Sequence, residues 1–131
     1  MTEINEENKQ IGTGVNIKNV GISEEMHQKL NQLVGEGYFS NLMDGYRLAA
    51  SIAILKRMDI SDHKLINRQN IYDAAGVDEN QSYTNTISQL FPEYKGIENT
   101  ALEKFADLGT KFIFEEINSN DELDIESLLN S

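Results

Sequence analysis

The segment from Leu42 to Leu55 constrains the fold more than any other part of this sequence, because its helical pattern has almost no polar face. Only Asp44, Arg47 and Ser51 interrupt its aliphatic, aromatic and small residues. A helix that is apolar on nearly all sides has to be buried by neighbouring elements. Its small residues would let a symmetry mate approach closely, so we expect a self-interface on this helix. That interface is predicted to comprise Leu42, Tyr46, Ala49, Ala50 and Ala53.

A short strand and an amphipathic helix are predicted ahead of this apolar helix. In residues 15–20, Val15 and Ile17 alternate with polar residues, which is typical of a half-buried strand. Ser23 can then cap a helix whose apolar stripe ends at a glycine turn, residues 35–37. Ser40 is the predicted cap of the apolar helix. Phe39 is expected to pack back on the first turns of that helix as a hydrophobic staple.

The remaining pattern predicts a connecting loop and two further helices. Residues 59–70 read as the loop, and residues 71–77 fit either a short strand or one helical turn. Ser82 is the predicted cap of a third helix that stops before Pro92. Thr100 is expected to open the last helix. That helix runs through a single Gly109, which we interpret as a site of close contact.

The chain length favours a single domain. The residue patterns predict that this domain is mainly α, with about four helices after a short N-terminal strand. We assign residues 1–13 to a flexible arm, 14–118 to the domain and 119–131 to an acidic tail. Within the domain, 14–58 form the core and 59–118 a helical extension. Cysteine is absent, and no apolar run is long enough to span a membrane. A cytoplasmic protein with no membrane association is therefore expected.

The negative charge is concentrated in the second half of the chain. Residues 1–64 contain seven Lys and Arg against nine Asp and Glu, whereas residues 65–131 contain four against thirteen. Nucleic-acid affinity depends on Lys and Arg displacing counterions from phosphates, so any DNA contact must come from the first half. The acidic half instead has two interpretations. It either keeps the protein soluble or contacts a protein partner.

No residue pattern predicts an active site, a cofactor site or a metal site. His27 and His63 lie far apart in the sequence and lack carboxylates at ligand spacing. Arg47 is the most unusual charge, since it interrupts the apolar helix. We expect Arg47 to pair with Asp44 one turn earlier, or to contact a partner. The tail residues Leu123, Ile125 and Leu128 alternate with acids and are the other predicted partner contacts.

The order of strand, capped helix, glycine turn and apolar helix in residues 15–57 resembles the ribbon-helix-helix family. That resemblance implies a dimer whose paired strands place polar side chains in the DNA major groove. The corresponding DNA contacts would be Asn16 and Lys18, with Asn19 a weaker candidate.

Residues 21–30 and 46–53 are also similar to the DndE family, the small accessory proteins of bacterial DNA phosphorothioation and restriction systems. This resemblance implies a small, helical, oligomeric protein that assists a DNA-acting enzyme.

Together these observations predict a non-catalytic, oligomeric accessory subunit of a prokaryotic complex, such as an anti-phage defence or DNA-modification complex. It would be a dimer or a higher oligomer and would act through protein–protein interaction. The alternative is a ribbon-helix-helix repressor or antitoxin, whose strand binds an operator while its acidic tail covers a toxin.

Overall fold

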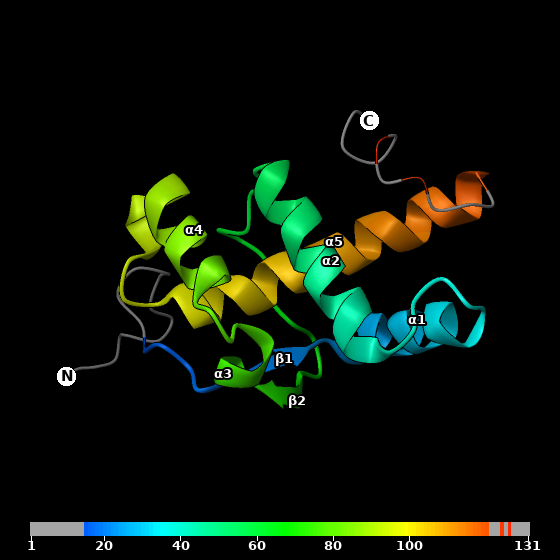
Figure 1. Ribbon diagram of the computed structural model, residues 1–131, viewed down its shortest axis with the longest axis horizontal. Coiled ribbons are helices and arrows are strands. Elements are labelled where there is room, and N and C mark those ends of the chain that lie inside the picture. Colours follow the sequence, from blue (N-terminus) through cyan, green and yellow to red (C-terminus); the bar gives the residue numbers. More distant parts are fainter. Residues whose placement is uncertain (1–14, 121–123, 125, 127–131) are drawn as a thin grey trace.

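The computed structural model describes residues 15–120 together with Asp124 and Glu126. The predicted arm, most of the predicted tail and the partner contacts Leu123, Ile125 and Leu128 lie outside the described residues. The described part is mainly helical with one small antiparallel sheet, as the sequence predicts (Figure 1). In chain order its elements are β1 Asn19–Ile22, α1 Glu24–Gly35, α2 Leu42–Leu55, β2 Gln69–Asp73, α3 Ala74–Val77, α4 Ser82–Leu90, the 3-10 helix η2 Pro92–Tyr94, and α5 Glu98–Asn120.

Helix α5 runs along the length of the molecule, and α2 crosses it to form the most extensive helix contact (Figure 1). The two backbones approach most closely where Gly109 faces Ala49. A Cβ built at Gly109 would lie 2.5 Å from the carbonyl carbon of Ala49. The close contact predicted at Gly109 is therefore confirmed, and it explains why α5 carries a glycine in mid-helix.

The burial of α2 differs from the prediction. Tyr46, Ala49, Ala50 and Ala53 have no exposed surface, because elements of the same chain cover them, with α5 as the main partner of α2. A symmetry mate is not needed to bury these four side chains. Of the five predicted interface residues only Leu42 is partly exposed, so self-association stays a prediction without a defined surface.

The sheet consists of β1 and β2, which pair antiparallel within the chain. Asn19 lies opposite Asp73 and Ile22 opposite Gln69, with an irregularity between Val20 and Gly21. The strand is therefore centred several residues later than the predicted 15–20. The physical reason is that the side chains of Val20 and Ile22 are fully buried, whereas Val15 is 82% exposed.

The helix ends test the predicted caps. Ser23 caps α1 by accepting a hydrogen bond from the Met26 amide, as predicted. Asn41, rather than Ser40, caps α2 through the Asp44 amide. Phe39 does pack back on α2, because its ring lies against Gly45. These contacts fix the angle at which the chain enters α2.

The later elements depart from the prediction in detail. Residues 71–77 contain both of the alternatives, the end of β2 followed by the single turn α3. Ser82 does not cap α4; the buried Asp78 carboxylate accepts hydrogen bonds from the amides of Tyr83 and Thr84 instead. Helix α4 ends before Pro92, as expected, and α5 begins at Glu98 rather than Thr100. One continuous core contains residues from both predicted parts of the domain.

Candidate functional site

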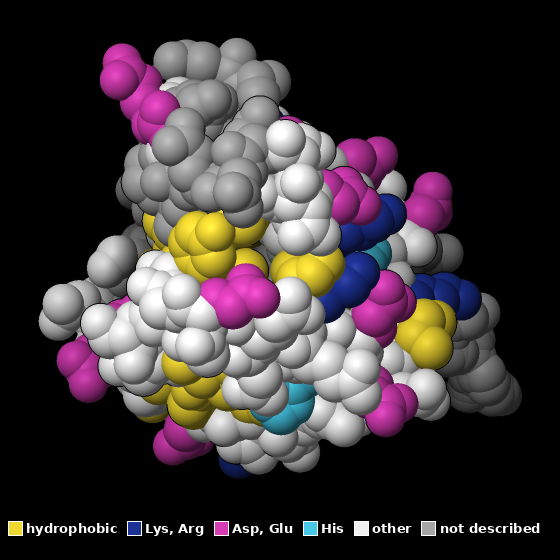
Figure 2. All heavy atoms as spheres, turned by 90° about the vertical axis from the view of Figure 1, so that its right-hand side faces the viewer, with side chains coloured by type: hydrophobic (Ala, Val, Ile, Leu, Met, Phe, Trp, Pro, Cys, Tyr) yellow, Lys and Arg dark blue, Asp and Glu magenta, His cyan; other side chains and the backbone are white. Residues whose placement is uncertain are grey.

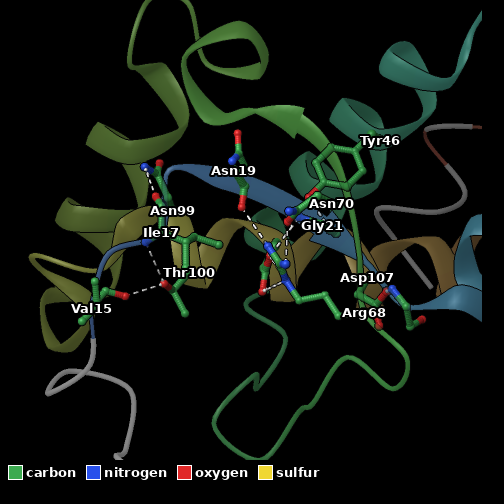
Figure 3. A network of polar contacts seen from close by, with 12 residues as sticks. Val15, Ile17, Asn19, Gly21, Tyr46, Arg68, Asn70, Asn99, Thr100 and Asp107 are labelled. Atoms are coloured by element: carbon green, nitrogen blue, oxygen red, sulfur yellow. Dashed lines mark hydrogen bonds and ion pairs between the residues drawn. The ribbon is translucent and has the colours of Figure 1, made fainter.

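Two buried carboxylates of α5 bind the backbone of β1 and of the residue that follows it. Glu103 is 6% exposed, and its Oε1 accepts a hydrogen bond of 2.9 Å from the Gly21 amide. The Arg68 guanidinium pairs with the same carboxylate, with Nη2 2.9 Å from Oε1, and also donates to the Asn19 carbonyl (Figure 3). A Cβ on Gly21 would lie 3.0 Å from the Arg68 guanidinium carbon. Gly21 thus leaves room for the ion pair beside the strand.

Asp107 is the second of these carboxylates and is 2% exposed. One of its oxygens accepts a 2.8 Å hydrogen bond from the Ser23 amide, and the other lies 2.7 Å from His63 Nε2. Lys104 donates to the His63 carbonyl, and burial lowers the pKa of its ammonium group. These bonds attach the 59–67 loop to α5 and to the start of α1. The two histidines have different partners, since the ring of His27 bonds to the Gln69 side chain.

The His63–Asp107 pair borders an open groove of about 680 Å³ between α1, α5 and the 60–67 loop. A histidine oriented by a buried aspartate is the arrangement of a general base. Here, however, the other oxygen of Asp107 holds the Ser23 backbone amide, and the Ser23 hydroxyl caps α1 by accepting from the Met26 amide. The arrangement is accounted for by its structural role of joining three segments.

Tyr46 completes the network, because its hydroxyl donates a 2.8 Å hydrogen bond to the Gly21 carbonyl. Burial raises the pKa of Tyr46 well above its usual value, and the nearby Glu103 and Asp107 carboxylates raise it further. The folded protein therefore keeps Tyr46 protonated at a pH where the unfolded chain ionises it.

The raised pKa predicts how a Tyr46→Phe substitution will respond to pH. At pH 7 the variant should be less stable by about 1 kcal/mol, because the Gly21 carbonyl loses its donor. Above about pH 10, where an unfolded tyrosine ionises, the wild type should lose stability that the phenylalanine variant cannot lose. The difference in the free energy of unfolding between the wild type and Tyr46→Phe should therefore become smaller as the pH rises above about 10. Urea titrations of both proteins at several pH values would measure it. A gap that widens with pH would contradict the assignment.

Arg47 does not pair with Asp44, contrary to the prediction. Its guanidinium donates to the carbonyls of Gly76 and Val77, each at 3.0 Å, and so binds the last turn of α3. A cation at the carbonyl end of a helical turn is favourable. Asp44 lies on the exposed side of α2. Arg47 thereby links α2 to the segment that leads into α4, which is an internal role. A partner contact through Arg47 stays a prediction.

A second groove lies between α2 and α4, and it is mainly apolar. Tyr83 holds the two helices together, since its hydroxyl bonds to the Arg47 carbonyl and lies 3.1 Å from the Ser51 hydroxyl. The volume of the groove is about 340 Å³. Leu55 at its edge is 62% exposed. We call this feature the α2–α4 groove; its lining residues are Ser51, Ile54, Leu55, Ser82, Tyr83 and Thr86.

Two cations follow Leu55 at the end of α2. Lys56 lies 5.2 Å from the ring centre of Phe112, and Arg57 lies 5.7 Å from that of Phe91. Each of these cation–π contacts holds a positive charge over the face of an aromatic ring. We call Lys56 and Arg57, which directly follow the exposed Leu55 in the chain, the basic rim.

The predicted DNA-contacting residues lie before β1, beside the start of α5. The Asn16 side chain accepts a hydrogen bond from the backbone amide of Asn99. Thr100 bonds to both the Val15 carbonyl and the Ile17 amide (Figure 3). Lys18 is exposed, and its carbonyl accepts from the Ala74 amide. This segment thus pairs with its own chain, whereas the ribbon-helix-helix resemblance implies pairing across a dimer. DNA contact through Asn16 and Lys18 stays a prediction.

Comparison with family models, with curated proteins and with solved structures gives no match to this chain. Among the described residues, no group of three or more histidine and acidic side chains is placed to hold a metal ion. Within the same residues, every helix is too short or too polar to cross a membrane. The surface chemistry of the chain is therefore the guide to what it binds.

Sequence reasoning missed the residues that matter most here, although some signals were present. Glu103 and Asp107 share a helical face with Thr110 and Ile117, at spacings of four, seven and fourteen residues from Glu103. That spacing indicates carboxylates turned toward the core rather than toward solvent. Nothing in the sequence distinguishes Leu55 from the buried aliphatic residues before it, because its exposure depends on how the helices pack in three dimensions.

Proposed function

We propose that this protein is a non-catalytic accessory subunit that acts by binding another protein through the α2–α4 groove. The observation that carries the proposal is Leu55, a large aliphatic side chain left 62% exposed at the edge of an apolar groove. An exposed apolar patch with a polar or charged rim is typical of a protein-interaction site. The partner would bury Leu55 against Ile54 and Tyr83.

The groove has the composition of a binding surface. Its six lining residues include no carboxylate, imidazole, thiol or ammonium group. Two of its hydroxyls, those of Ser51 and Tyr83, bond to one another, and Tyr83 also bonds to α2. Its walls are thus held in place before a partner binds, which reduces the entropy lost on association.

The charge distribution favours a protein partner over DNA itself. The chain has a net charge of −11. On the face that includes α1, Lys and Arg side chains are interspersed with Asp and Glu and form no continuous basic area (Figure 2). A phosphate backbone would find little counterion release on such a surface. By its resemblance to the DndE family, we propose that the partner belongs to a DNA-acting complex of a prokaryotic defence or modification system.

The test is a Leu55→Glu substitution in the tagged, full-length protein, followed by affinity purification from the native host and mass spectrometry. The partner should be lost, because burying an unpaired carboxylate in an apolar groove costs a large desolvation free energy. Ile66→Glu is the matched control, since Ile66 is 67% exposed but lies on the other groove, beside His63. Both variants should retain the wild-type circular dichroism.

Two outcomes would contradict the proposal. Retention of every partner by the folded Leu55→Glu variant would show that the α2–α4 groove is not the docking surface. Equal loss of partners in Leu55→Glu and Ile66→Glu would show that binding depends on general surface polarity rather than on this groove. Nuclease treatment before elution separates protein partners from proteins that are held only through DNA.

A further inference from the structure

We propose that the α2–α4 groove also binds the chain's own C-terminal segment, residues 121–131, which thereby competes with the partner. This inference rests on the proposed function, since it takes the groove to be a peptide-docking surface. Three observations carry it: the chemistry of the segment, its attachment point at the end of α5, and the basic rim beside Leu55.

The composition of the segment matches the groove. Four carboxylates are interspersed with the aliphatic residues Leu123 and Ile125, and a Leu128–Leu129 pair follows. A short amphipathic segment of this kind buries its apolar side chains in a groove and leaves its acids at the edge. The α2–α4 groove offers Ile54, Leu55 and Tyr83 for the apolar side chains.

The attachment point puts the groove within reach. Lys56, the residue after Leu55, lies over the ring of Phe112 on α5. From Phe112 to Asn120 the helix advances by about 12 Å, at about 1.5 Å per residue. An extended chain spans about 3.3 Å per residue, so residues 121–125 suffice to return by about 16 Å to the level of Lys56. The segment up to residue 131 is therefore long enough to reach Leu55.

The charges are complementary along that path. The segment contributes Asp121, Glu122, Asp124 and Glu126, whereas the rim of the groove carries Lys56 and Arg57. A partner that displaces this segment should present the same chemistry, an acidic peptide with leucine or isoleucine at alternate or paired positions.

The test uses the full-length chain, which contains no natural cysteine and can therefore be labelled at one introduced position. A nitroxide on Ser131→Cys should broaden the amide resonances of Ser51, Leu55, Tyr83 and Thr86. It should leave those of Gln28 and Asn67, which line the other groove, unchanged. Leu128→Glu in the labelled chain should abolish the broadening, since it removes an apolar anchor of the segment. Leu128 lies outside the described residues.

The outcomes separate this inference from the proposed function. Absence of broadening at the groove would overturn the inference. A second experiment mixes nitroxide-labelled chains without isotope enrichment with isotope-enriched chains without nitroxide. If the groove resonances broaden only in that mixture, the occupant is a second copy of the chain, which would also overturn the inference. If the label stays away from the groove while Leu55→Glu still loses the partner, the proposed function stands alone. With the segment bound in cis, Leu128→Glu should increase partner recovery from the host.

Discussion

Replacing Gly109 with Ala is expected to destabilise the protein by about 3 kcal/mol, even though alanine is the better helix former by about 1 kcal/mol. The added methyl group would lie 2.5 Å from the Ala49 carbonyl carbon and 3.0 Å from its Cα. Carbon atoms in contact prefer a separation of about 3.5–4.0 Å, so α2 and α5 must move apart. That movement loosens the largest helix contact of the core.

Urea-induced unfolding monitored by circular dichroism would measure this effect. Gly35→Ala is the matched control, because Gly35 also lies in a helix but a Cβ there meets no atom within 4 Å. It should leave the free energy of unfolding unchanged or raise it by up to about 1 kcal/mol. If Gly109→Ala proved as stable as Gly35→Ala, the close crossing of α2 over α5 would be wrong.

The helical content could be predicted from the sequence because it depends on local signals. The apolar stripe of α1 and its Ser23 cap act within a few residues, and so does the stop at Pro92. The mid-helix Gly109 was also informative, since its cost in a helix requires a compensating contact. What these signals could not supply was the identity of the contacting element, which proved to be α2 of the same chain.

The arrangement of the strand and of α2 could not be predicted, because both depend on residues distant in the sequence. An apolar helix needs burial, but its pattern is the same whether α5 or a second copy provides it. Likewise, the position of β1 is decided by Arg68, Glu103 and Asp107, which bind the backbone of β1 and of the residue after it from at least 49 residues away. The predicted alternation at Val15 and Ile17 was overridden by these contacts.

The candidate site was beyond sequence reasoning for a related reason. Arg47 and Asp44 are one turn apart, which favours a local ion pair. The structure instead gives Arg47 two carbonyl acceptors at the end of α3, which the sequence does not bring near it. That contact, together with the Tyr83 hydroxyl, positions α4 against α2 and so creates the α2–α4 groove. The groove is a consequence of tertiary packing alone.

Glu103→Ala should have the largest effect on stability of the substitutions considered, a loss of about 3–5 kcal/mol in the free energy of unfolding. Glu103 is 6% exposed and serves two partners, the Gly21 amide and the Arg68 guanidinium. Without the carboxylate, the buried Gly21 amide lacks its acceptor, and Arg68, whose side chain is 32% exposed, loses its ion-pair partner. A buried amide without an acceptor, together with a partly buried charge without its partner, costs more than a surface pair contributes.

Glu25→Ala provides the matched control, since it removes another carboxylate that forms an ion pair. Glu25 is 71% exposed and pairs with Lys29 one turn away, so its loss should cost no more than about 0.5 kcal/mol. Adding Arg68→Met to Glu103→Ala should recover part of the loss, because the unpaired guanidinium disappears together with its partner. If the double variant were as unstable as the sum of the two single variants, the pair would not be coupled. The network that positions β1 would then require another explanation.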